Sequence, residues 1–291
     1  MASLQSITLG SGRRVAYRLF GDPGGFPVLS CHGGLMSGSD AAPSDAVARA
    51  LGLLIVSPDR PGIGGSTRRP GHRMLDWARD DVTALLDRLG ASGVDVSRFG
   101  VTGWSEGAQY ALAVGHVHTE RVSGIALVAG ALPLDEPRAF RELNATDRLM
   151  AVLSARAPGV AAGLFGLARG VVRAYPRLSA FASGAALDRS DAALLRRSSA
   201  WFSRAVREGL RDAWGAVDEY HAFVGHWGFT PEQVGVPVVL HQGGADRLVP
   251  AHWALELERR LPHATLRRYP GEGHFVVHAH RAAILASIPR P

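Results

Sequence analysis

Short apolar runs and longer amphipathic segments alternate along most of the chain. Continuous apolar runs are typical of strands buried on both faces, and apolar residues recurring every three or four positions are typical of helices. The first two runs flank Gly10-Ser11-Gly12, which predicts a hairpin. The predicted strands span residues 6–9, 13–20, 27–31, 53–57, 98–102, 122–129, 236–240 and 265–269, and the predicted helices span 40–51, 75–89, 108–114, 251–261 and 274–288. This alternation predicts an α/β fold, with a mostly parallel, twisted sheet of about eight strands and helices on both faces.

The alternation stops at Pro133 and resumes near Val236. Residues 133–233 have a helical pattern, rich in Ala and Arg, and carry 11 of the 21 aromatic side chains. We therefore predict a core domain made of residues 1–132 and 234–291, and a helical cap, residues 133–233, inserted after the sixth strand. Most of these aromatic side chains are expected to form the core of the cap, while some line a substrate pocket. The pocket candidates are Trp104, Trp201, Trp214 and Trp227.

Composition narrows the class of partner. The single cysteine, Cys31, favours a reducing compartment, and the N-terminus lacks the pattern of a signal peptide. No apolar run is long enough to span a bilayer, so we expect a cytoplasmic protein without a membrane partner. The formal charge is +6, but all 32 basic residues are arginines scattered among acids, which argues against nucleic-acid binding. A homodimer is compatible with this composition.

The candidate chemistry begins at Gly103-Trp104-Ser105-Glu106-Gly107, between a predicted strand and a predicted helix. A serine on such a tight turn is exposed for attack, and the flanking glycines let strand and helix approach closely. The N-terminus of the helix supplies free N–H groups that can stabilise an oxyanion. The side chain of Glu106 has two interpretations: it is a charge at the helix N-terminus, or it reaches the reactive groups around Ser105. Trp104 points either into the core or toward the pocket.

A base and an acid follow downstream in the order Ser, Asp, His that nucleophile-elbow hydrolases use. Asp246 and His274 both come after predicted strands, where ligands bind in open α/β sheets. His274 would accept the proton of Ser105, and Asp246 would hold the imidazole in the useful tautomer. Asp135 is the alternative acid, and Asp59 is expected to fix its own loop.

These motifs resemble the α/β-hydrolase fold family, in particular capped esterases and proline-iminopeptidase-like members. The resemblance covers nearly the whole chain apart from the cap. It rests on 32–34 (His-Gly-Gly), 59–66 (Asp-Arg-Pro-Gly-x-Gly-x-Ser), 103–107, 244–250 (Gly-Ala-Asp-Arg-Leu-Val-Pro) and 273–274 (Gly-His). It implies an oxyanion hole made by the backbone N–H groups of Gly34 and Glu106. It also implies that His32 shapes this loop.

The sequence thus predicts a serine esterase that cleaves an ester or related acyl bond of a small, largely apolar substrate, with water as second substrate and no cofactor. Aminopeptidase, amidase, lactonase, carbon–carbon bond hydrolase and perhydrolase activities are compatible with the same residues. An aminopeptidase needs acids near the site, and the only acidic doublets of the cap are Asp218-Glu219 and Asp135-Glu136. The histidine pairs 116/118 and 278/280 do not share a helix face, so no metal site is expected. A ligand-binding protein that has lost the chemistry is the alternative from another class.

Overall fold

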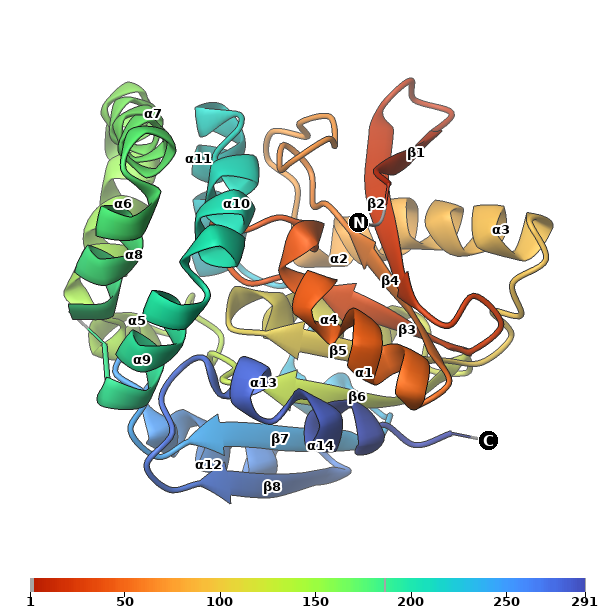
Figure 1. The fold of residues 1–291 in the computed structure, drawn as a ribbon. Coiled ribbons are helices and arrows are strands. Elements are labelled where there is room, and N and C mark those ends of the chain that lie inside the picture. The colour runs from red at the N-terminus through yellow and green to blue at the C-terminus, as the bar shows by residue number, and fades with distance from the viewer. Residues whose placement is uncertain (1–2, 186, 291) are drawn as a thin grey trace.

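An eight-stranded sheet forms the centre of the computed structural model, which describes residues 3–185 and 187–290 (Figure 1). The spatial order is β1-β2-β4-β3-β5-β6-β7-β8. β1 and β2 pair antiparallel, β2 pairs antiparallel with β4, and the remaining pairs are parallel. The strands are β1 Gln5–Thr8, β2 Arg14–Gly21, β3 Phe26–Cys31, β4 Leu53–Pro58, β5 Phe99–Trp104, β6 Val122–Val128, β7 Val238–Gly243 and β8 Ala264–Tyr269. The predicted sheet and its strand positions are confirmed.

Helices cover both faces of this sheet, and each face has its own apolar cluster. In β4, Leu54 and Val56 face one cluster, while Leu53 and Ile55 face the other, as the two-residue period of a strand requires. The first cluster includes side chains of α2 Met74–Asp76, α3 Thr83–Ala91, α4 Glu106–Val117 and α12 Ala251–Arg260. The second includes side chains of α1 Asp45–Ala50, α13 Val276–Ala279 and α14 Arg281–Ala286.

Two predicted helices differ from the structure. The helix predicted over 40–51 begins as a 3₁₀ helix, Gly38–Ser44, and becomes α-helical only in α1. Pro43 lies inside the 3₁₀ segment and has no N–H for an α-helical hydrogen bond. The helix predicted over 274–288 is two short helices, α13 and α14, because His280 leaves helical geometry. A π-helical segment, Trp77–Val82, joins α2 to α3.

Between β6 and β7 the chain forms only helices and loops within the described residues; we call this segment (residues 133–233) the helical insertion. Its elements are α5 Pro137–Glu142, α6 Ala145–Arg156, α7 Pro158–Ala174, α8 Pro176–Ala185, α9 Arg189–Arg197, α10 Ser199–Gly209, α11 Ala213–Val224 and the 3₁₀ helix Pro231–Gln233. α10 and α11 lie nearer the sheet than α6–α8, which form the outer layer at the left of Figure 1. Across residues 3–185 and 187–290, no helix combines the length and the apolarity needed to cross a membrane.

Candidate active site

Ser105 lies at the junction of β5 and α4 in a strained backbone conformation. Its φ is 57° and its ψ is −126°, a region that non-glycine residues rarely adopt, at a cost of about 1–3 kcal/mol. The Ser105 N–H donates to the carbonyl of Val128 on the neighbouring strand at 2.9 Å. The flanking glycines allow this turn. A Cβ on Gly103 would collide with α4, and a Cβ on Gly107 would collide with the backbone carbonyl of Cys31 at the end of β3.

Asp246 and His274 form a hydrogen-bonded pair at the same edge of the sheet. His274 Nδ1 and Asp246 Oδ2 are 2.9 Å apart. Because an ionised carboxylate only accepts hydrogen bonds, Nδ1 carries the proton and Nε2 is left as the base. Asp246 is held in turn by the backbone N–H groups of Leu248 and Val249, at 2.8 and 3.0 Å.

The electrostatics of this pair favour a charged carboxylate and a basic imidazole. Burial opposes the charge on Asp246, but the His274 imidazole and the backbone donors lower the pKa of Asp246. Burial also opposes the charge on His274, but the charge and hydrogen bond of Asp246 raise the pKa of His274 above its ordinary value. The acidic partner of His274 is therefore Asp246, whereas the alternative, Asp135, is an exposed residue.

The loop that carries His274 is fixed on two sides. From the core, Trp104 Nε1 donates to the carbonyl of His274 at 2.9 Å, and the two rings lie 5.5 Å apart. From the helical insertion, the buried Asp191 carboxylate accepts the N–H of His274 at 2.8 Å and that of Phe275 at 2.9 Å. Ser190 Oγ accepts the N–H of Gly273 at 3.0 Å.

Sequence reasoning missed Asp191. An acid in the first turn of a predicted helix is typical of ordinary helix N-termini, so nothing in the local pattern marks it. The contact arises only when α9 packs against a loop that is 83 residues further along the chain.

Trp104 brings Ser105 and the Asp246–His274 pair into one region, because it precedes Ser105 directly and contacts His274. Ser105 is half-buried and His274 is buried. No hydrogen bond joins the Ser105 hydroxyl to His274 within the described part of the chain. Such catalytic hydrogen bonds are often loose without substrate and tighten in the complex.

Gly34 and Glu106 lie side by side, as a shared oxyanion site requires. A Cβ on Gly34 would lie 3.5 Å from the Cβ of Glu106 and 2.6 Å from its Oε2. Across residues 3–185 and 187–290, the backbone N–H groups of Gly34 and Glu106 donate to no protein acceptor. The loop is held by Asp40, which accepts the N–H of Gly33 at 3.0 Å, and by His32, whose Nε2 accepts the N–H of Arg60 at 3.3 Å.

The Glu106 side chain turns inward and is buried rather than exposed at the helix N-terminus. Its Oε1 lies 3.9 Å from Arg60, whose Nε donates to Glu219 of α11 at 2.7 Å. Burial and the charge of Glu219 raise the pKa of Glu106 well above its ordinary value, although Arg60 opposes this shift. The raised pKa favours the protonated form of the Glu106 carboxyl, which lies next to Gly34.

Three of the four acids that the sequence offered for an ammonium group are already paired, among them Glu136 with Arg260 at 2.7 Å, and the fourth, Asp135, is exposed. Glu219 binds Arg60 of the core, and Asp218 binds Arg68 of the core at 2.9 Å. Asp59 accepts the backbone N–H groups of Gly38 and Gly65 at 2.8 and 2.9 Å, so it fixes its loop as predicted.

The four tryptophans named as pocket candidates do not gather around Ser105. Trp104 lies beneath the His274 loop. Trp201 donates to the carbonyl of Asp40 at 3.2 Å, and its ring contacts that of His278 in a tilted arrangement, with centroids 4.2 Å apart. Trp214 is exposed on α11 over Arg68, and Trp227 is buried against Phe229. Contact of these four residues with substrate stays a prediction.

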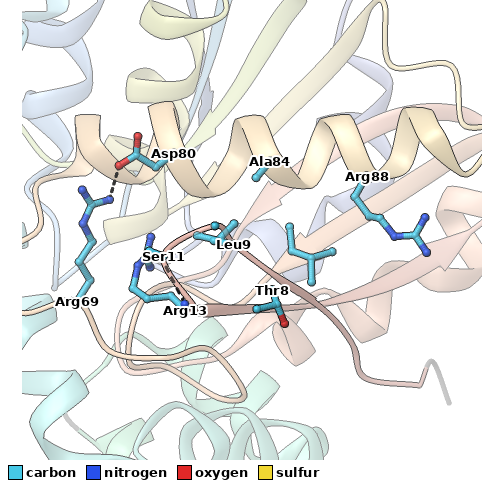
Figure 2. A pocket seen from close by; sticks show the side chains of 10 residues that line it. Thr8, Leu9, Ser11, Arg13, Arg69, Asp80, Ala84 and Arg88 are labelled. Carbon is cyan, nitrogen blue, oxygen red and sulfur yellow. Dashed lines mark hydrogen bonds and ion pairs between the residues drawn. The ribbon is translucent and has the colours of Figure 1, made fainter.

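A cavity of about 610 Å³ between the β1–β2 hairpin and α3 lies apart from these residues (Figure 2). Arg69 in its wall pairs with Asp80 at 2.6 Å, and Arg13 pairs with Asp81. Two of the three arginines that line the cavity are therefore neutralised, and the third, Arg88, is exposed on α3.

Comparison with known proteins identifies the class that this fold and site define. The family model described as alpha/beta hydrolase fold matches residues 27–280, and the chain belongs to this family. Non-heme chloroperoxidase of Streptomyces lividans is 27% identical over 285 residues, which are 94% of each chain.

Solved structures agree with this assignment. A thermophilic esterase from Thermogutta terrifontis superposes with a TM-score of 0.71 over 98% of this chain and 96% of its own, at 19% identity. The enol-lactonase from Burkholderia xenovorans LB400 superposes with a TM-score of 0.69 over 97% and 100%, at 17% identity. These likenesses confirm the predicted fold.

Proposed function

We propose that this protein is a serine hydrolase that cleaves an ester of a small, largely apolar acid or alcohol. Residues 133–233 act as its cap. The observation that carries the proposal is that Trp104 links the proposed nucleophile to the proposed base. Trp104 directly precedes the strained Ser105, and its Nε1 donates to the carbonyl of His274, which is paired with Asp246. Apolar residues flank three of the proposed site residues, namely Leu35 beside Gly34, Leu248 near Asp246, and Phe275 beside His274.

In the proposed reaction, Ser105 Oγ attacks the acyl carbonyl while His274 Nε2 accepts its proton. The oxyanion of the tetrahedral intermediate accepts hydrogen bonds from the N–H groups of Gly34 and Glu106. His274 then returns the proton to the leaving alcohol, and the acyl group stays on Ser105. Water, deprotonated by His274, attacks the acyl-enzyme, and the carboxylic acid leaves with Ser105 regenerated. Asp246 keeps Nδ1 protonated and stabilises the imidazolium in both halves.

An ester is favoured over an aminoacyl amide by the state of the nearby acids. A free α-ammonium group needs an unpaired carboxylate, but Glu219 and Asp218 are engaged by Arg60 and Arg68. Burial raises the pKa of Glu106 and so favours its neutral form over the carboxylate that an ammonium group would need. In the second acidic doublet, Glu136 is paired with Arg260 and Asp135 is exposed, so the aminopeptidase alternative has less support than the esterase.

Perhydrolysis is a second candidate, favoured by the similarity to a chloroperoxidase that is named as lacking heme. Hydrogen peroxide would attack the acyl-enzyme in place of water, giving a peroxy acid and free Ser105. The test adds hydrogen peroxide and acetate or an acetyl ester and assays peracid formation. Peracid production that disappears in Ser105→Ala supports this activity.

The hydrolase proposal is tested by labelling with a fluorophosphonate and by turnover of short-chain p-nitrophenyl esters. We expect wild-type protein to be labelled at Ser105, and Ser105→Ala to lose labelling and at least about 10³-fold in kcat with little change in Tm. Asp246→Asn is expected to lose about 10⁴-fold, whereas Asp135→Asn retains activity. A folded wild-type protein that resists labelling would favour the non-catalytic ligand-binding alternative.

A further inference from the structure

Three neighbouring helices of the insertion expose large apolar side chains on the layer farthest from the sheet (Figure 1). Of the eleven large apolar side chains that are exposed in the described chain, nine lie between residues 149 and 181. Six of them define what we call the outer apolar face: Val160, Leu164, Leu167 and Val171 of α7, with Leu178 and Phe181 of α8. Their exposed fractions are between 42% and 65%. A patch of this kind marks an interaction surface.

The sequence of α7 shows that this exposure is built in rather than incidental. Val160, Leu164, Leu167 and Val171 recur at helical spacing on one face, whereas the buried Ala161, Phe165 and Val172 occupy another. The helix therefore has two apolar faces, and only one of them packs against the rest of the protein. Gly159, Gly163, Gly166 and Gly170 run alongside, and a Cβ on any of them would meet nothing within 4 Å.

The charges around this face have a single sign. Residues 148–187 contain Arg148, Arg156, Arg169, Arg173 and Arg177 and no acidic residue. None of these five arginines forms an ion pair within the described residues. Arg156, Arg173 and Arg177 are exposed, whereas Arg148 is half-buried and Arg169 lies on the packed side of α7 with its Nε buried. An exposed apolar helix face in a segment whose exposed charges are all arginines matches the composition of helices that lie in the interface of a membrane.

We propose that the outer apolar face docks on the surface of an anionic lipid bilayer. A second copy of this chain would bring the three exposed arginines of one copy close to those of the other, with no acid between residues 148 and 187 to compensate, which is repulsive in a two-fold contact. An anionic lipid surface attracts the same charges, with about fivefold in affinity for each arginine near the surface. The expectation of no membrane partner rested on the lack of a spanning segment, which does not bear on a helix that lies flat in the interface.

The test is co-sedimentation of the full-length protein with vesicles of phosphatidylcholine, with and without phosphatidylglycerol, over a range of NaCl concentrations. Ser105→Ala is the background, so that lipid hydrolysis does not alter the vesicles and the result is independent of the proposed activity. We expect binding to the phosphatidylglycerol vesicles that weakens as salt rises. We expect about tenfold or greater loss of binding in Leu164→Ser/Leu167→Ser and in Arg173→Gln/Arg177→Gln.

Two controls keep the test specific. Leu4→Ser alters an exposed apolar residue outside the insertion and should bind as the background does. Phe181→Trp provides a fluorescent reporter, whose emission should shift to shorter wavelength when anionic vesicles are added. The proposal is overturned by no binding at low salt, or by binding that the paired leucine substitutions leave unchanged. A concentration-dependent dimer that the paired leucine substitutions abolish would also overturn it, because the outer apolar face would then bind a second copy of this chain.

Discussion

The inner and outer sides of the helical insertion differ sharply in charge, although the segment as a whole is nearly balanced. Residues 133–232 contain 13 arginines and 11 acids. Seven of these acids contact residues of the core: Glu136, Glu142, Asp191, Glu208, Asp218, Glu219 and Glu232. The outer stretch, residues 148–187, has five arginines and no acid.

This difference shows how the insertion is attached. These seven acids reach inward and bind core arginines, backbone N–H groups or, in the case of Glu142, the side chains of His252 and Trp253, so the contact is specific in register as well as in charge. Three of these acids contact loops of the candidate site. Glu219 binds Arg60, Glu208 binds Ser37, and Asp191 binds the His274 loop. Net charge over the segment hides this arrangement because inward acids and outward arginines cancel in the sum.

The largest expected effect on stability is at the buried ion pair between Arg60 and Glu219. Both side chains are at most 2% exposed, so Glu219→Gln leaves a buried guanidinium without its main counter-charge. Breaking such a pair from one side typically lowers the free energy of unfolding by about 3–5 kcal/mol. Urea unfolding measures the change.

Glu232 provides the matched control. It also binds a core arginine, Arg260, at 2.7 Å, but its side chain is half exposed. Glu232→Gln is expected to lower the free energy of unfolding by less than about 1 kcal/mol. If Glu219→Gln and Glu232→Gln lowered the free energy of unfolding equally, burial would not determine how much each ion pair between insertion and core contributes to stability.

The second prediction concerns Asp191, which we treat as a positioning residue. Asp191→Asn keeps the shape but replaces one acceptor oxygen by an amide that cannot accept the N–H of His274 or Phe275. A small displacement of the base costs about 10–10² in rate, so we expect kcat to fall in that range with little change in KM.

The pH profile distinguishes a positioning role of Asp191 from a purely structural one, because a purely structural role would leave the profile unchanged. The negative charge of Asp191 also raises the pKa of His274. The acid limb of the kcat/KM profile should therefore move to lower pH in Asp191→Asn. Ser190→Ala, which removes only the contact to Gly273, should leave that limb in place.

The sequence predicts those parts of the molecule that local chemistry determines. The strands follow from apolar runs, and the turn at Ser105 follows from glycines that no larger residue can replace. The order of Ser105, Asp246 and His274 at the ends of strands can likewise be predicted from the sequence. In the structure, His274 Nδ1 lies 2.9 Å from Asp246 Oδ2.

The sequence does not predict contacts that depend on how distant helices pack. Asp191 is indistinguishable from other acids in first helical turns until α9 meets the His274 loop. The pocket tryptophans were selected by residue type, but Trp227 is buried and Trp214 is exposed, because helix packing decides their surroundings. The inward turn of Glu106 depends on Arg60 and Glu219, which lie 46 and 113 residues away.

The third prediction is a bell-shaped pH dependence with two assigned limbs. Below the pKa of His274, which is raised above its ordinary value, the base is protonated and activity is lost as the pH falls. Above the raised pKa of Glu106, a carboxylate forms beside Gly34 and opposes the oxyanion, so activity falls severalfold as the pH rises. Glu106→Gln should abolish the alkaline limb and keep the acid limb. A persistent alkaline decline in Glu106→Gln would assign that limb to another group.

The smallest expected effect is on the outer side of the insertion. Leu167 is 65% exposed, so Leu167→Gln removes no packed contact and should change the free energy of unfolding by less than about 0.5 kcal/mol. Turnover of a soluble short-chain ester should also be unchanged, because the substitution lies on the layer farthest from the sheet. Phe165, two residues earlier on the buried face of α7, is the matched position, and Phe165→Ala should cost about 3–5 kcal/mol. A large loss of stability in Leu167→Gln would show that this face is already covered in the folded protein. The distinction between the inner side of the insertion, which is attached to the core, and its free outer side would then be wrong.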